Sequence, residues 1–210
     1  MNENLQEALR RIQVTYDKKL SALHLTELEL DHFPDLLLKA KHITVLGMTG
    51  NVLKELPDEI GEMENLRVLE LGGNQLTSIP ASFGKLKNLR VCVLRDNKIK
   101  SLPDELGQLG SLKMLELRNN KLESVPETIS QLTGLRELYL SQNKLKSLPE
   151  NIGNMTDLQK LDVSHNKIRE LPQSLSNLKL MRMLWLNGNP LKNIPVPIQD
   201  LPNLEFFQFE

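Results

Sequence analysis

The sequence predicts an α/β solenoid, in which short structural repeats stack side by side around one continuous hydrophobic core. The main observation is a motif made of Leu66, Leu69, Leu71, Asn74 and Leu76, which recurs along the chain with a constant step of 23 residues. A second observation is a proline column that runs in phase with this motif. Its members are Pro34, Pro57, Pro80, Pro103, Pro126, Pro149, Pro172 and Pro195. Because the columns stay in phase without a slip, no other fold class explains them.

Each repeat is predicted to open with a short β-strand. In the segment from Leu112 to Leu117, alternation from Met114 onward directs Leu115 and Leu117 inward and Met114 and Glu116 outward. Strands of successive repeats then pair in parallel about 4.8 Å apart, which predicts a concave sheet spanning roughly 40 Å. The first positions of the repeats mark eight full units and the opening strand of a ninth: Leu20, Ile43, Leu66, Leu89, Leu112, Leu135, Leu158, Met181 and Leu204.

Three further columns describe how the chain leaves each strand and returns. After the strand, the buried amide of an asparagine can satisfy backbone groups that the turn leaves unpaired. This structural ladder comprises Asn51, Asn74, Asn97, Asn120, Asn143, Asn166 and Asn189. On the convex side, one apolar residue stands three positions after the proline and another three further on, which is the spacing of a single helical turn packed inward. The first of these columns is Ile60, Phe83, Leu106, Ile129, Ile152, Leu175 and Ile198.

The repeat unit resembles the leucine-rich repeat, L-x-x-L-x-L-x-x-N-x-L followed by L-P-x-x-I-x-x-L. The form with 23 residues is similar to that of intracellular scaffolds such as Scribble and Erbin, the Ras-group plant repeats and many bacterial proteins. The resemblance covers Leu20 to Phe209. It implies a horseshoe with a parallel concave β-sheet and short 3-10 or helical convex segments. It also implies a scaffold or adaptor role, in some members with small GTPases or kinases as partners.

The two ends of the chain depart from the repeat, as the ends of a solenoid must, because a terminal unit has no neighbour on one side. Residues 1–19 read as an amphipathic helix with Leu5, Ala8, Leu9 and Ile12 on its apolar face, and we expect it to cap a repeat domain at residues 20–210. The last strand leaves Phe207 and Phe209 without a cap. That edge is consistent with truncation, with continuation of the chain or with self-association.

Composition narrows the classes of partner and the compartment. Lys and Arg number 26 against 27 Asp and Glu, a formal net charge of −1, so we expect neither nucleic acid nor a membrane as partner. The start of the chain has no signal-peptide core, and Cys92 is the only cysteine. These features predict a cytoplasmic protein without disulfides.

No residue pattern indicates catalysis, a metal or a cofactor. His24, His32 and His42 fall on different faces of one unit, and Cys92 occupies an inward leucine column. Asp162 could pair with Glu116 or Glu137, but on an open sheet we expect these carboxylates to stay in water, without the desolvation that tunes a pKa. The sequence therefore predicts that the chain is not an enzyme.

The outward strand positions are not uniformly polar, which indicates a binding surface. One apolar zone joins Val68, Val91 and Met114 with Val45 and Val93. The second zone brings Met183, Trp185 and Phe206 together, with Tyr139 two units away across Asp162. Aromatic residues dominate binding hot spots, so the second zone is the preferred anchor. The alternatives are ordinary β-branched residues on a sheet and a Trp185 that packs on Phe206 as a local cap.

Charged and polar columns flank these zones. Arg95 and Arg118 adjoin a strip formed by Asp96, Asn119, Gln142, His165 and Asn187, which we expect to orient a partner. A basic stripe formed by Arg67, Arg90, Lys113, Arg136 and Arg182 could attract an acidic segment, although a solvated basic edge is the favoured interpretation.

Taken together, the residues predict a module that binds another protein on its concave face, with five anchors: Tyr139, Asp162, Met183, Trp185 and Phe206. One alternative is the sensor or targeting domain of a larger signalling enzyme, such as a kinase, ubiquitin ligase or cyclase, with the catalytic part beyond residue 210. Another is a structural role in which the C-terminal edges of two solenoids pair.

Overall fold

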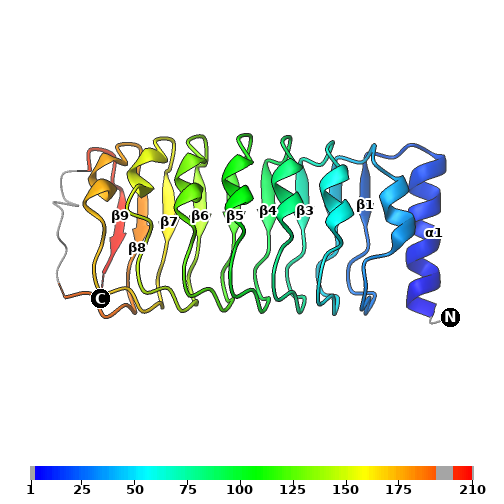
Figure 1. The fold of residues 1–210 in the computed structure, drawn as a ribbon, viewed down its shortest axis with the longest axis horizontal. Coiled ribbons are helices and arrows are strands. Elements are labelled where there is room, and N and C mark those ends of the chain that lie inside the picture. The colour runs from blue at the N-terminus through cyan, green and yellow to red at the C-terminus, as the bar shows by residue number, and fades with distance from the viewer. Residues whose placement is uncertain (1–2, 193–200, 210) are drawn as a thin grey trace.

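The computed structural model describes residues 3–192 and 201–209, and these form one helix followed by a solenoid (Figure 1). Helix α1 (Glu3–Asp17) lies at one end, and nine parallel strands follow in a single open sheet in chain order. The strands are β1 (Ala22–His24), β2 (Val45–Gly47), β3 (Val68–Glu70), β4 (Val91–Val93), β5 (Met114–Glu116), β6 (Glu137–Tyr139), β7 (Lys160–Asp162), β8 (Met183–Trp185) and β9 (Phe206–Gln208).

Each strand pairs with the next so that residues 23 apart in the sequence become lateral neighbours. In the pairing of β3 with β4, for example, Val68 lies beside Val91 and Leu69 beside Cys92. The middle residue of each strand points into the core, and Leu69 and Cys92 have no exposed surface. The first and third residues face the concave side, as the alternation in the sequence predicts.

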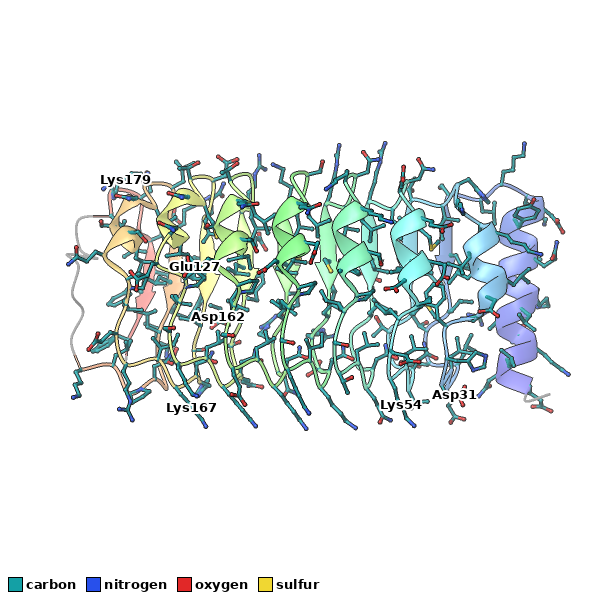
Figure 2. All side chains as sticks on the ribbon, in the orientation of Figure 1. Asp31, Lys54, Glu127, Asp162, Lys167 and Lys179 are labelled. Atoms are coloured by element: carbon teal, nitrogen blue, oxygen red, sulfur yellow. The ribbon has the colours of Figure 1, made fainter. Side chains whose placement is uncertain are left out.

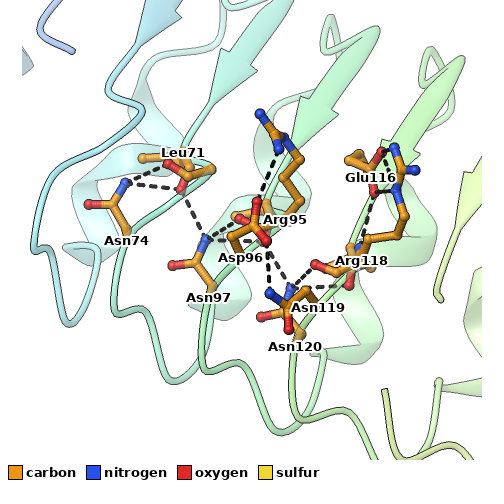
Figure 3. Close-up of polar contacts among 12 residues, drawn as sticks. Leu71, Asn74, Arg95, Asp96, Asn97, Glu116, Arg118, Asn119 and Asn120 are labelled. Atoms are coloured by element: carbon orange, nitrogen blue, oxygen red, sulfur yellow. Dashed lines mark hydrogen bonds and ion pairs between the residues drawn. The ribbon is translucent and has the colours of Figure 1, made fainter. Parts of the chain in front are cut away.

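The asparagine ladder joins neighbouring repeats through buried hydrogen bonds (Figure 3). The Nδ2 group of Asn97 donates to the carbonyl of Leu94 in its own repeat and to that of Leu71 in the preceding repeat, each at 3.0 Å. Its Oδ1 accepts the backbone N–H of Leu76 at 3.0 Å. The first repeat has Leu28 in this column, and Asn51 compensates because its Oδ1 accepts both the Leu28 and the Leu30 N–H groups.

The convex side consists of short 3-10 turns that begin after the prolines. Pro103, for example, has φ −73°, and its carbonyl accepts the N–H of Leu106 at 3.1 Å. Leu106 and Leu109 are fully buried, whereas the predicted members Pro195 and Ile198 lie outside the described residues. The turns are η1 (Asp35–Lys39), η2 (Asp58–Glu62), η3 (Ala81–Lys85), η4 (Asp104–Gln108), η5 (Glu127–Gln131), η6 (Ile152–Asn154) and η7 (Gln173–Asn177).

A glycine column allows these turns to stack closely. A Cβ on Gly107 would lie 2.3 Å from the carbonyl oxygen of Thr128 in the next turn, and Gly61, Gly84 and Gly153 meet the next turn in the same way. The carbonyl approach leaves no room for a side chain. Ser130 occupies this column in η5, and the following turn, η6, is the only one of the seven described turns with three residues rather than five.

The residue before each ladder position turns the chain with a left-handed backbone. Gly73 has φ +64°, and three of the eight residues in this column are glycine. The other five carry side chains at a conformation that costs an L-residue roughly 1–2 kcal/mol. They are Glu27, Asp96, Asn119, Gln142 and His165, with φ between 51° and 56°.

Helix α1 packs against the first repeat. Ala8 and Ile12 are fully buried in the continuous core, while Leu5 and Leu9 are partly buried against it. On the outer face, Glu7 forms ion pairs with Arg10 and Arg11, each 2.7 Å long. At the other end of the sheet, Phe207 stands in the inward column of β9 and is nevertheless 38% exposed.

Candidate protein-binding face

The first apolar zone, which we call the aliphatic row, is continuous on the concave face. The strand register places Val45, Val68, Val91 and Met114 side by side across β2 to β5, and Val93 adjoins them at the end of β4. All five side chains are partly exposed rather than buried. The structure therefore brings together the predicted residues Val68, Val91 and Met114 on an accessible surface.

The second apolar zone, which we call the aromatic patch, consists of Met183, Trp185 and Phe206 on β8 and β9. The Trp185 and Phe206 rings have centroids 5.4 Å apart and planes tilted by 41°. Met183 pairs with Phe206 in the strand register, and Phe206 is 43% exposed. Three of the predicted anchors thus form one patch, in which Trp185 keeps part of its ring accessible while it contacts Phe206.

Tyr139 stands apart from this patch and belongs to a polar cluster. It is two strands from Trp185, about 10 Å at a spacing of 4.8 Å per strand. Its hydroxyl donates to Glu137 Oε2 at 2.9 Å, and the Arg118 guanidinium lies 5.1 Å from its ring centroid. Burial and the hydrogen bond with Glu137 both raise the pKa of Tyr139, so the phenol stays protonated.

Arg118 is held in place by Glu116. Its Nη2 lies 2.6 Å from Glu116 Oε2, and its Nε contacts both carboxylate oxygens (Figure 3). These hydrogen bonds raise the pKa of Arg118 above its ordinary value. Two donors on one carboxylate fix the guanidinium plane, so the arginine presents a pre-organised donor edge beside Tyr139.

The carboxylates on this face are less exposed than the sequence suggested. Glu116 is 5% exposed and Asp162 9%, so the expectation that both stay in water is wrong. The reason is lateral packing, because Asp162 lies between Tyr139 and Trp185 in the strand register. Its Oδ1 accepts the backbone N–H and the hydroxyl of Ser164, at 3.0 and 2.7 Å, which leaves Asp162 little surface for a partner.

The polar strip lies where the chain leaves the strands. Arg95 pairs with Asp96 at 3.1 Å, and Asn119 donates to Asp96 Oδ1 at 2.8 Å. Asn187 Nδ2 lies 3.4 Å from His165 Nε2. Four members of the strip have a left-handed backbone conformation that is strained for any residue with a side chain. Glycine would relieve this strain, so the presence of polar side chains at these positions indicates that they have a role.

Two residues of the Tyr139 cluster were missed by the sequence analysis as binding residues. Glu137 accepts the tyrosine hydroxyl, and Lys160 lies 3.0 Å from its other carboxylate oxygen. The sequence did contain a signal for them. At the first position of each strand, which faces outward, Glu137 and Lys160 are the two polar residues in an otherwise apolar series. Their ion pair separates the aliphatic row from the aromatic patch.

Other candidate chemistry does not converge within the described part of the chain. No group of three His, Cys, Asp or Glu side chains among those residues is placed to hold a metal ion. Cys92 is fully buried, and burial raises the pKa of its thiol to about 12. Among residues 3–192 and 201–209, no helix combines the length and apolar character needed to cross a membrane.

The fold and this face define a repeat solenoid with an exposed sheet, an architecture that generally serves as a protein-interaction module. A family model described as a leucine-rich repeat region matches residues 83–165 and 129–210, and a leucine rich repeat model matches residues 41–98. The chain belongs to the leucine-rich repeat family. No curated protein sequence matches it.

Solved structures of repeat proteins are similar to the whole solenoid. A leucine-rich repeat protein of Leptospira interrogans is 30% identical, with a TM-score of 0.82 over 95% of this chain and 56% of that one. YopM, a leucine-rich effector protein of Yersinia pestis, is 24% identical with a TM-score of 0.85, covering 100% of this chain and 54% of its own. The plant peptide hormone receptor RGFR1, in complex with RGF2, is 21% identical with a TM-score of 0.67, over 90% of this chain and 35% of the receptor. The chain thus spans about half the length of the two bacterial proteins.

Proposed function

We propose that this chain is a protein-interaction module whose concave face recognises a folded protein or an extended segment. The observation that carries the proposal is the partly exposed Trp185–Phe206 pair beside Met183 on an open sheet. An aromatic pair on a rigid sheet offers a large contact area at little cost in conformational entropy. Arg118, fixed by Glu116, adds oriented donors beside Tyr139 on the same face.

The residues of the concave face have different roles in this proposal. Met183, Trp185 and Phe206 act as anchors, and the aliphatic row with Val68, Val91 and Met114 forms a second contact. Tyr139, Arg95 and Arg118 orient the partner by hydrogen bonds and ion pairs, which supply specificity more than affinity. Asp162 supports the face through Ser164 rather than as a primary contact.

The test is capture from source-cell lysate by the intact chain, by Trp185→Ala and by a matched control on the convex side, Gln108→Ala. We expect a partner that the intact chain and Gln108→Ala retain and that Trp185→Ala loses. A central tryptophan contributes about 2 kcal/mol or more, so affinity should fall by about thirtyfold. Equal capture by all three chains would refute the aromatic anchor, and loss on Gln108→Ala alone would move the interface to the convex side.

Self-association is a second candidate, and the exposure of Phe207 favours it. The equivalent inward residue of β8, Leu184, is fully buried, while Phe207 and Phe209 stack with ring centroids 6.4 Å apart. An end-to-end dimer would cover this pair. Sedimentation equilibrium of the intact chain and of Phe207→Ser tests it, because a monomer at every concentration would exclude pairing.

We also propose where the repeat domain begins, which compartment the protein occupies and which class of partner it binds. Residues 1–19 serve as the N-terminal cap of a repeat domain at residues 20–210, and the protein acts in the cytoplasm, with a signalling protein such as a small GTPase or kinase as a candidate partner. The alternative is a targeting domain of a larger signalling enzyme. Sequencing the gene beyond the codon for Glu210 distinguishes the two, since a stop codon directly after it would refute the alternative.

A further inference from the structure

The edge where each repeat turns away from its strand carries a row of cations. Lys98, Lys121, Lys144 and Lys167 each follow a ladder asparagine in four successive repeats. Their backbone N–H groups make the same hydrogen bond, to Leu76, Ile99, Leu122 and Leu145 of the preceding repeat, at 2.8 to 2.9 Å. This repeated bond places the four lysines in register on one edge. Figure 2 shows Lys167 there, on the side of the molecule opposite to Lys179.

A second row runs parallel to the first, two residues further along each repeat. We call the two rows together the lysine edge: Lys98, Lys100, Lys121, Lys144, Lys146, Lys167, Arg169 and Lys192. All eight side chains are exposed. Within the described residues none of them forms an ion pair, and the one side-chain hydrogen bond among them joins Lys98 Nζ to Gln75 Oε1 at 2.9 Å. Parallel cations that form no ion pairs repel one another, so bringing an anionic surface to the edge would lower this repulsion.

Charge is strongly segregated over the molecule. The segments that carry the eight cations of the lysine edge also contain two carboxylates, Glu123 and Glu170, so these segments have a net charge of +6. The whole chain has a net charge of −1, so the rest of the chain carries −7. Acidic residues gather instead on the convex turns, where Asp58, Glu59 and Glu62 line a shallow depression. The net charge predicted no attraction to membranes. Net charge is an average over the whole chain, whereas an anionic surface responds to charges within a Debye length of about 8 Å.

We propose that the lysine edge docks this solenoid onto the surface of an anionic lipid bilayer. Seven of the eight cations are lysine. Lysine is a flexible, strongly hydrated point charge suited to diffuse attraction by lipid headgroups, while arginine predominates where phosphates or bases are gripped bidentately. At about 4.8 Å per repeat, the four lysines of the first row extend over roughly 14 Å of straight edge, which a planar surface contacts at once.

The surroundings of the edge disfavour other anionic partners. No Phe, Tyr or Trp lies among residues 97–103, 120–126, 143–149 or 166–172, so unpaired bases have no ring on which to stack. A protein interface needs a desolvated apolar centre, and the edge offers none. The cleft beside Lys146, Arg169 and Lys192 also contains Glu150 and Glu170, which would repel a single phosphate group. The attraction is therefore spread along the edge, and it leaves the concave face free.

The experiment is flotation of the intact chain with phosphatidylcholine vesicles, with or without about 30% phosphatidylserine. We expect binding to the anionic vesicles alone, weakening as salt increases. The triple variant Lys121→Glu, Lys144→Glu, Lys167→Glu should lose affinity by at least about a hundredfold, since each cation contributes about fivefold. The matched control is Arg67→Glu, Arg90→Glu, Arg136→Glu, which changes net charge equally at exposed arginines at the opposite ends of the strands. It should retain binding.

Several outcomes would overturn the proposal. Absence of binding to the anionic vesicles would do so, as would equal loss in both triple variants, because net charge rather than the edge would then govern attraction. Tighter binding to a duplex or single-stranded oligonucleotide at the same salt would assign the edge to nucleic acid. Circular dichroism of both variants controls for folding. Partner capture by the lysine variant separates this proposal from concave binding, which it should leave intact.

Discussion

Replacing Gly107 by alanine tests whether the glycine column sets the spacing of the convex turns. The added Cβ would lie 2.3 Å from the Thr128 carbonyl oxygen and 2.9 Å from its carbonyl carbon. Ordinary contact begins near 3.4 Å, so η4 and η5 would have to separate by about 1 Å at this point, and both contacts are with backbone atoms that cannot rotate away. Overpacking of this kind costs about 1–3 kcal/mol, against which alanine recovers about 0.5–1 kcal/mol of backbone entropy.

We therefore expect Gly107→Ala to lower the free energy of unfolding by about 1–2 kcal/mol, measured by urea denaturation followed by circular dichroism. Gly110 provides the control in the same repeat, because a Cβ there meets nothing within 4 Å. Gly110→Ala should be neutral or slightly stabilising, by up to about 1 kcal/mol. If the two variants unfold at the same urea concentration with unchanged slopes, close stacking does not set the spacing and the argument fails.

Three further predictions concern the ladder, the cysteine and the cap. Asn120→Ala should lower the free energy of unfolding, measured in urea, by about 2–4 kcal/mol, because it removes buried hydrogen bonds to Leu94, Leu117 and Ile99. The control is the exposed change Asn119→Gly, which should lower it by less than about 1 kcal/mol. Equal losses in the two variants would argue against a stabilising role of the ladder. Cys92, with its pKa raised from 9.0 to about 12, should react with a disulfide reagent at pH 8 only upon unfolding, and rapid labelling of the native chain would contradict its burial. The hydrogen bonds from Arg10 and Arg11 lower the pKa of Glu7 from 4.5 to about 2, so its contribution is complete above pH 4.5 and is lost as pH falls toward 2. The difference in melting temperature between the intact chain and Glu7→Gln should shrink over that interval, whereas a constant difference would show that ionisation is not involved.

The repeat phase predicted the sheet because it assigns every strand residue to a face. Val68 and Glu70 lie on the concave side and Leu69 in the core, and the same assignment holds 23 residues further on. The solenoid, its parallel register and the convex turns all follow from columns of one kind of residue. Hydrophobic periodicity is a local property, so the sequence alone was sufficient for it.

Features that depend on contacts between repeats could not be predicted in the same way. The need for glycine at Gly107 arises from the distance to the next turn, and the burial of Glu116 and Asp162 depends on how neighbouring long side chains lie over the sheet. Tyr139 appeared to belong with Trp185, yet its hydroxyl and ring are engaged by Glu137 and Arg118. These contacts depend on side-chain rotamers and on the neighbouring strands, and the repeat pattern of the sequence specifies neither.

The most direct test of concave recognition is photocrosslinking to the captured partner. A benzophenone amino acid replaces Val91 on the concave face in one variant and Gln108 on the convex side in another, both at accessible positions. We predict that the partner crosslinks at position 91 and not at position 108. Crosslinking at position 108 alone would contradict the central claim, because the partner would then lie on the opposite side of the solenoid.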